Sequence, residues 1–302
     1  MMAVVNRMIG HQHDIMLENH DVGKYSDDSV NGNGLPLDPP GPGRSRQAKL
    51  SALLYGAEGV SARSTRIYEA VLDESPRIRA GNFTVIAAAD LELLFRLYDA
   101  EFFRGLLAEM LAEDGAHPMG FRLSRRLIRS AGQTIRQVRR VRSGRRIVDQ
   151  TEYEIAVSTT LLFSTFQNVE REVVVGGLAC HDRLEALQRI FEHELLHLAE
   201  FLGWGKSSCS AANFHALSRR IFAHEGHTHD LVTPREQAAV AFDVRVGDIV
   251  EFDLDAKRHR GRVNRITRRA SVLVEDPRGE PFNDGRCYLT FYVPLPLLRK
   301  VL

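Results

Sequence analysis

The chain has 302 residues, with 40 basic and 39 acidic side chains and a formal net charge of +1. This balance means that bulk charge argues neither for nor against a nucleic-acid partner. No apolar run reaches the roughly 18 residues of a membrane span, so no membrane association is predicted. The N-terminus lacks an apolar signal core, and the three cysteines are odd in number and far apart. We therefore expect a cytoplasmic protein of one or two domains without disulfides.

Residues 1–80 are predicted to form a disordered or weakly ordered tail. Residues 27–46 are rich in Gly, Pro, Asn, Asp and Ser. That composition buries too little apolar surface to offset the chain entropy that folding removes. A short helix over residues 64–72 is the alternative for part of this tail, and we favour the solvated tail over it.

Residues 82–232 are predicted to form an α+β domain. Asp90 can cap a leucine-rich helix, and a second helical segment covers residues 102–111. Segments with strand-like composition follow at 119–128, 133–141 and 152–157, and Ser143-Gly144 is predicted as a hairpin turn between the last two. We then expect a short helix at 159–166 and a strand at 173–175.

The motif with the clearest chemistry is His193-Glu194-Leu195-Leu196-His197, of the form HExxH, within an apolar helix that ends at Gly203 and Gly205. Helical positions four apart lie on one face, so both imidazoles can bind one zinc ion. Glu194 then lies beside an open metal position. There it can take a proton from a water that attacks a peptide carbonyl.

Residues 242–302 are predicted to form a small β-barrel. Apolar and polar side chains alternate over four short segments separated by polar turns. Residues 247–252 and 261–263 resemble an SH3-like or KOW-type module. Arginines between 258 and 269 give this module a basic edge.

Four pieces of the sequence, in order, resemble the SprT-like (Spartan-type) zinc metallopeptidases. The pieces are residues 94–106, 122–132, 154–158 and the HExxH motif. The resemblance covers about residues 90–230. It implies a zincin-like fold, in which the HExxH helix packs on a small β-sheet, with one Zn²⁺ per chain, His193 and His197 as ligands and Glu194 as general base. It also implies cleavage of DNA-associated proteins, because characterised relatives degrade proteins crosslinked to DNA.

The chain departs from this family at the third zinc ligand. The family has a histidine at the start of the next helix, where this sequence has Ser210. Serine is a poor zinc ligand, whereas the thiolate of Cys209 is a good one. Cys209 is our first choice for the third ligand, His215 the second and His224 the third. The alternative for Cys209 is a small buried residue at a helix start.

Further charged residues bear on the metal site and on a nucleic-acid partner. Glu200 lies on the same helical face as His197 and could orient a ligand, or it could be a solvated glutamate. Glu192 is expected on the surface. Residues 122–146 contain ten arginines and no acidic residue, which favours nonspecific phosphate contacts over the alternative of two strands whose polar face is simply arginine-rich. The candidates for nucleic-acid contact are Arg125, Arg126, Arg139 and Arg140.

These patterns together predict a zinc-dependent endopeptidase with a protein substrate. DNA would be contacted through the arginine-rich hairpin and the C-terminal barrel. The alternative is a noncatalytic, zinc-stabilised nucleic-acid-binding or adaptor protein, because four protein ligands would leave no open position for water.

Overall fold

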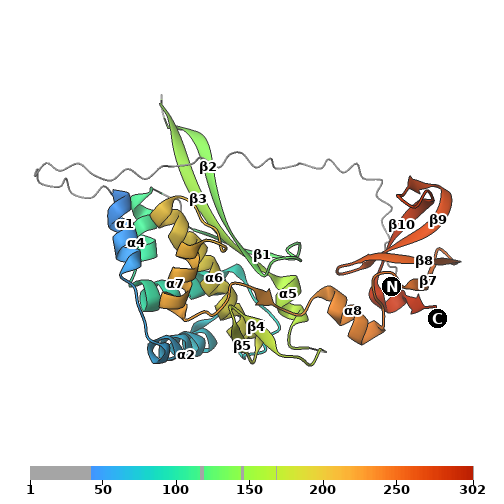
Figure 1. Cartoon of the computed structure of the whole chain (residues 1–302), viewed down its shortest axis with the longest axis horizontal. Helices are drawn as coiled ribbons and strands as arrows, with labels where there is room; N and C mark the ends of the chain where they lie inside the picture. Colours follow the sequence, from blue (N-terminus) through green and yellow to red (C-terminus); the bar gives the residue numbers. More distant parts are fainter. Residues whose placement is uncertain (1–41, 116–118, 144–145, 168, 302) are drawn as a thin grey trace, which may run out of the picture.

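The computed structural model describes residues 42–115, 119–143, 146–167 and 169–301. Over these ranges the protein is a mixed α+β structure, as predicted. A larger unit holds most of the helices, and a smaller C-terminal unit is built on a sheet (Figure 1). Residues 1–41 of the predicted tail lie outside the described residues. None of the helices in the described ranges is both long and apolar enough to cross a membrane.

The larger unit is built around helix α6, which the other helices surround (Figure 1). Its helical segments are α1 (Pro42–Ser51), α2 (Ala57–Glu74), α3 (Ala88–Tyr98), the π-helix η1 (Asp99–Phe103), α4 (Leu106–Glu113), α5 (Thr159–Ser164), α6 (Arg183–Trp204) and α7 (Ala212–Phe222).

The prediction of a weakly ordered tail up to residue 80 is wrong for its second half. Helices α1 and α2 occupy residues that we expected to be solvated, and Leu50, Val60, Ile67 and Val71 are buried in the main core. Residues 60, 67 and 71 follow the spacing of one helical face, so α2 buries an apolar stripe. The Gly- and Pro-rich composition nearby concealed this periodicity.

Helix α6 has a side-chain cap at its start and a glycine at its end. The side chain of Asp182 caps the first turn by accepting from the main-chain N–H of Glu185 at 2.9 Å. At the other end Gly205 has a φ of 71°, a left-handed conformation that glycine adopts without strain. The buried guanidinium of Arg183 donates to main-chain carbonyls of Phe83, Leu162 and Thr165. These bonds hold the start of α6 against α5.

A three-stranded sheet packs against α6 in the order β1-β3-β2. Strand β1 (Gly120–Ser124) runs parallel to β3 (Arg146–Ser158), and β2 (Gly132–Ser143) runs antiparallel to it. Strand β2 is an edge strand, and the β2–β3 hairpin projects from the body of the unit (Figure 1). The predicted turn at Ser143-Gly144 lies partly outside the described residues.

A second small sheet has the order β5-β4-β6. It consists of β4 (Val173–Val175), β5 (Leu178–Cys180) and β6 (His229–Asp230). After α7, strand β6 pairs with β4, which contacts α6. This pairing sets His229 opposite Val175. The sequence predicted β4 but neither of its partners.

The smaller unit has its own core and follows helix α8 (Pro234–Phe242). Its antiparallel sheet has the order β10-β9-β8-β7-β11. The elements are β7 (Ile249–Leu254), β8 (Lys257–Ile266), β9 (Ala270–Pro281), β10 (Cys287–Val293), the 3₁₀ helix η2 (Leu295–Leu297) and β11 (Arg299–Lys300). The four longer strands match the predicted segments. Val250, Phe252, Val263 and Val272 form the centre of this core.

Candidate metal centre

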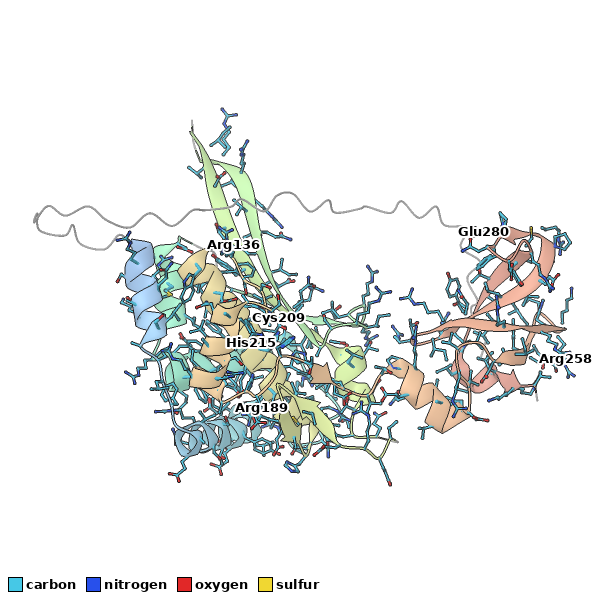
Figure 2. The ribbon with its side chains drawn as sticks, in the orientation of Figure 1. Arg136, Arg189, Cys209, His215, Arg258 and Glu280 are labelled. Carbon is cyan, nitrogen blue, oxygen red and sulfur yellow. The ribbon has the colours of Figure 1, made fainter. Side chains whose placement is uncertain are left out.

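The structure brings together the two histidines of the motif and the first-choice third ligand. The Nε2 atoms of His193 and His197 lie 3.1 Å apart, and one ligand atom each from His193, His197 and Cys209 lies within 4.8 Å of the others. Tetrahedral zinc with bonds of about 2.0–2.3 Å separates its ligand atoms by roughly 3.3–3.7 Å. The three side chains therefore fit a metal ion after a shift of about 1 Å at most. Figure 2 shows Cys209 near the middle of the larger unit.

Burial keeps the imidazoles in the form that binds metal. The pKa of His193 is lowered to about 2, mainly by burial and further by the charges of the neighbouring His229 and His197. Burial also lowers the pKa of His197. Neutral rings keep a lone pair for a cation, so metal does not have to compete with protons here at neutral pH. The ring of Phe214, from α7, packs against both histidines at centroid distances of 4.9 and 4.8 Å.

Glu200 orders both His197 and the loop that carries Cys209. Its carboxylate accepts from the hydroxyl of Ser207 at 2.7 Å, from the N–H of Ser208 at 3.1 Å and from the amide of Asn213 at 2.8 Å. The Ser207 hydroxyl also lies 2.6 Å from Nδ1 of His197. Because the Ser207 proton goes to Glu200, His197 donates from Nδ1 and keeps the Nε2 lone pair for metal. Glu200 is only 3% exposed, so the solvated alternative is excluded.

Glu194 is buried beside this cluster, where it meets the edge strand β2. Its Oε2 accepts from the hydroxyl of Thr134 at 2.8 Å. Burial raises the pKa of Glu194 to about 7, although the Thr134 hydrogen bonds oppose the shift. A carboxyl group that titrates near neutrality is suited to taking and returning a proton.

Gly132 leaves the space that Glu194 occupies. A β-carbon at position 132 would lie 2.5 Å from Oε1 of Glu194, whereas one at Gly120 would meet Glu154 at an ordinary 3.5 Å. We expect Gly132→Ala to lower the free energy of unfolding by about 1–3 kcal/mol, because the buried carboxylate must move. Gly120→Ala is the control and should change it by less than about 0.5 kcal/mol. Urea denaturation of both variants tests this, and equal stabilities would contradict it.

The third choice for a metal ligand, His224, is bonded elsewhere. Its Nε2 lies 2.7 Å from Oε2 of Glu192, and both side chains are fully buried. Tyr98 and Arg189 also donate to the Glu192 carboxylate. The expectation that Glu192 lies on the surface is therefore wrong, because α6 has neighbours on almost every side and this buried carboxylate is bonded to Tyr98, Arg189 and His224.

The second choice, His215, lies outside the three-residue group. Its ring contacts that of His227 at a centroid distance of 5.0 Å. Ser210, at the position of the family's histidine, pairs its hydroxyl with that of Ser208 at 2.9 Å. Of the three candidates for a third zinc ligand, Cys209 is therefore the one that lies with the two histidines of the HExxH motif.

His229 is close to the centre although the sequence did not single it out. Its ring lies 4.5 Å from that of His193 by centroid distance. The pKa of His229 is lowered to about 4, mainly by burial and further by the charges of His224 and His197. The only sequence signal was its place in a histidine-rich segment, which gives no indication of the long-range β4–β6 pairing.

The four arginine candidates fall into two groups. Arg139 and Arg140 project from β2 but lie 3.4 and 3.8 Å from Glu152 and Asp149 of β3. The absence of acids between residues 122 and 146 was therefore misleading for the hairpin, because acids on the paired strand partly neutralise it. Arg125 and Arg126 are exposed, and neither has a carboxylate partner in the described part of the chain.

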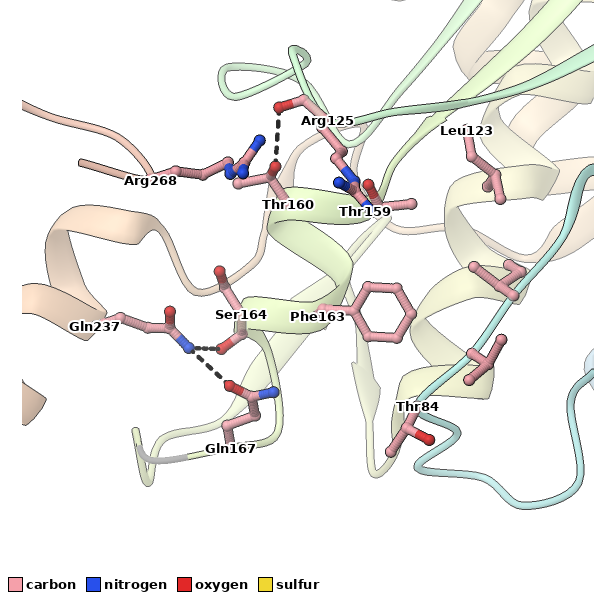
Figure 3. A pocket seen from close by; sticks show the side chains of 12 residues that line it. Thr84, Leu123, Arg125, Thr159, Thr160, Phe163, Ser164, Gln167, Gln237 and Arg268 are labelled. Carbon is pink, nitrogen blue, oxygen red and sulfur yellow. Dashed lines mark hydrogen bonds between the residues drawn. The ribbon is translucent and has the colours of Figure 1, made fainter. Parts of the chain in front are cut away.

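Arg125 lines a cleft of about 550 Å³ between the two units. Arg268, from the turn after β8, lies across from it, with Thr160 between the two and Thr159 beside Arg125 (Figure 3). Gln237 of α8 closes one side by donating to Ser164 and Gln167 of the α5 region. None of the lining residues belongs to the metal cluster.

Comparisons of the chain with protein-family models, with curated proteins and with solved structures found no match. The residues themselves and their arrangement are therefore the basis for a function.

Proposed function

We propose that this protein is a zinc-dependent endopeptidase with a zincin-like arrangement of its larger unit. The observation that carries the proposal is the convergence of His193, His197 and Cys209 within 4.8 Å beside the buried carboxylate of Glu194. Three protein ligands leave one position of a tetrahedral ion for water, as catalytic zinc requires. A general base on the same helical turn completes the set of groups for peptide hydrolysis.

The chemistry divides between the metal and the chain. Zinc, when bound, supplies an acidified water and a Lewis acid for the carbonyl. Glu194 takes the proton of the attacking water and returns it to the leaving amine. Strand β2 has an outer edge without a strand partner among the described residues. Because Gly132 and Thr134 of β2 contact Glu194, an extended peptide paired along this edge would pass the base.

The test is zinc-dependent cleavage of an unfolded protein such as casein. The purified protein should contain one zinc ion per chain, lose activity with 1,10-phenanthroline and regain it with added Zn²⁺. Cleavage that persists after zinc has been removed, as shown by metal analysis, would contradict the proposal.

A noncatalytic zinc site is the alternative, and the position of His229 is the observation in its favour. If His229 joined the other three side chains, four protein ligands would close the site to water. X-ray absorption on the zinc protein separates the two states. One sulfur, two nitrogens and one oxygen support a peptidase, whereas one sulfur and three nitrogens support a structural site.

We further propose that DNA is a partner, so that substrates are DNA-associated proteins. The support is the pair of exposed arginines, Arg125 and Arg268, at the cleft between the units. The strand order of the smaller unit, in which β11 returns beside β7, agrees with the SH3-like interpretation of that unit. Such folds serve several partner types, so the arginines carry this proposal.

Replacing Arg125 and Arg268 together with Gln should weaken binding to a short DNA duplex. Loss of two phosphate contacts is expected to reduce the slope of log affinity against log salt by about 1.8. The control, Arg139→Gln with Arg140→Gln, removes the same charge from arginines that have acidic partners, and should change the slope less. Fluorescence anisotropy between about 50 and 200 mM salt measures both slopes. Equal losses would mean that overall charge, and not the cleft, determines binding.

A further inference from the structure

His229 is held firmly beside the candidate metal centre. It pairs with Val175 across the β4–β6 ladder, and the next bond along, from Gly176 N–H to the carbonyl of Thr228, measures 3.0 Å. Its ring meets that of His193 at an interplanar angle of 77° and a centroid distance of 4.5 Å. The strand pairing therefore fixes the backbone position of His229 beside His193.

The Nε2 atom of His229 is buried and has no hydrogen-bond partner. Most buried polar side-chain atoms in folded proteins are hydrogen-bonded, so an exception beside a reactive cluster indicates a partner that arrives from outside the chain. Nδ1 of His193 and Nδ1 of His224 are also buried without a partner, but each of these rings uses its Nε2 within the chain, which His229 does not. Nε2 of His224 is used by Glu192, and Nε2 of His197 and His193 face each other.

His229 nevertheless falls outside the group of ligand atoms. The cluster whose ligand atoms all lie within 4.8 Å of one another consists of His193, His197 and Cys209. An imidazole next to such a cluster, but not part of it, can reach a molecule bound at the metal's open position. A neutral ring presents one N–H, which is a hydrogen-bond donor.

We propose that His229 is a catalytic residue that donates a hydrogen bond to the scissile carbonyl oxygen as this oxygen gains negative charge. This inference rests on the proposed peptidase function. When the water oxygen bonds to the carbonyl carbon, Glu194 takes the water proton and the C=O π electrons move to the carbonyl oxygen. When the C–N bond breaks, those electrons re-form C=O and Glu194 gives its proton to the amine. The His229 proton stays on its ring throughout.

The experiment compares His229→Ala and His229→Gln with the wild type, and uses His227→Ala as the matched control. His227 is exposed and two residues away. Three quantities are measured on the full chain: zinc affinity by chelator competition, kcat and KM for casein-derived peptides, and the affinity of the zinc protein for a phosphinic peptide. The tetrahedral phosphinate resembles the charged intermediate, so its binding affinity measures the contribution of the His229 hydrogen bond without turnover.

We expect His229→Ala to lower kcat by about 100-fold or more and phosphinic-peptide affinity by a similar factor. Zinc affinity and KM should change by less than about threefold. His229→Gln, which keeps an N–H donor and tests the role even where the alanine variant folds poorly, should recover part of both losses. His227→Ala should behave as wild type.

A loss of zinc affinity of more than about tenfold in His229→Ala would overturn the proposal by making His229 a ligand. Unchanged kcat and phosphinate binding would also overturn it. A wild-type protein that binds zinc but cleaves nothing would refute the peptidase function itself. In that case weaker phosphinate binding by His229→Ala would still support His229 as a hydrogen-bond donor, and equal binding would overturn that role.

Discussion

Replacing Glu194 with Gln is expected to lower kcat/KM for peptide cleavage by about 10³-fold or more while zinc content stays at one ion per chain. Glutamine has nearly the same shape and can still accept the Thr134 hydrogen bond, but it cannot take a proton from water. Glu194 is also absent from the ligand group, so the loss should not come from the metal. Peptide kinetics and metal analysis of the same preparation test both halves of the expectation.

The same residue should set the acid side of the pH profile. Burial raises the pKa of Glu194 to about 7, and a nearby zinc cation would stabilise the carboxylate and lower it again. Because the base acts only when deprotonated, kcat/KM should rise with pH through a value between about 4.3 and 7. The residual activity of Glu194→Gln should lack this rise. Full activity in that variant would remove Glu194 from the mechanism.

Replacing Cys209 with Ala is expected to weaken zinc binding by more than about 100-fold, since two histidines alone hold zinc poorly and second-shell losses already cost 10–100-fold. Cys287→Ala is the control, because this cysteine is also free but lies in the smaller unit. Chelator competition measures both affinities. In the cobalt-substituted protein, the near-ultraviolet thiolate-to-metal band should be lost only with Cys209.

Two further variants separate Cys209 from the alternatives. Cys209→His should retain most of the zinc affinity, because imidazole is also a good zinc ligand. His215→Ala should bind zinc like the wild type. If His215→Ala lost zinc and Cys209→Ala kept it, the third ligand would be His215 and the loop held by Glu200 would have another role.

Local sequence was sufficient for the elements whose determinants are close together. The end of α6 follows from the glycines that close its apolar run, whereas Asp182, which caps its start, was not among the predicted signals. The α8 helix was missed although Thr233 and Glu236 form a capping box around Pro234. In α2 the apolar stripe was present, but the neighbouring composition outweighed it.

Glu192 is a buried residue that the helical periodicity of apolar residues did not predict. An amphipathic helix has a solvent face, and the residue before His193 was assigned to it. Helix α6 instead has packed neighbours on nearly all sides, so its polar residues need buried partners. Those partners, Tyr98 and His224, lie 94 residues before Glu192 and 32 residues after it, a separation that no local pattern reveals.

The spacing of the motif was enough to place His193 and His197 on one helical face with Glu194 beside them, because helix geometry fixes positions three and four apart. The sequence also limited the candidates for a third zinc ligand to Cys209, His215 and His224. Only the tertiary structure brought Cys209 to the two histidines, through the loop that Glu200 holds, and only the tertiary structure set Thr134 against Glu194 and His229 against His193. Those contacts depend on strands β2 and β6, whose positions are set by packing and by pairing with distant strands.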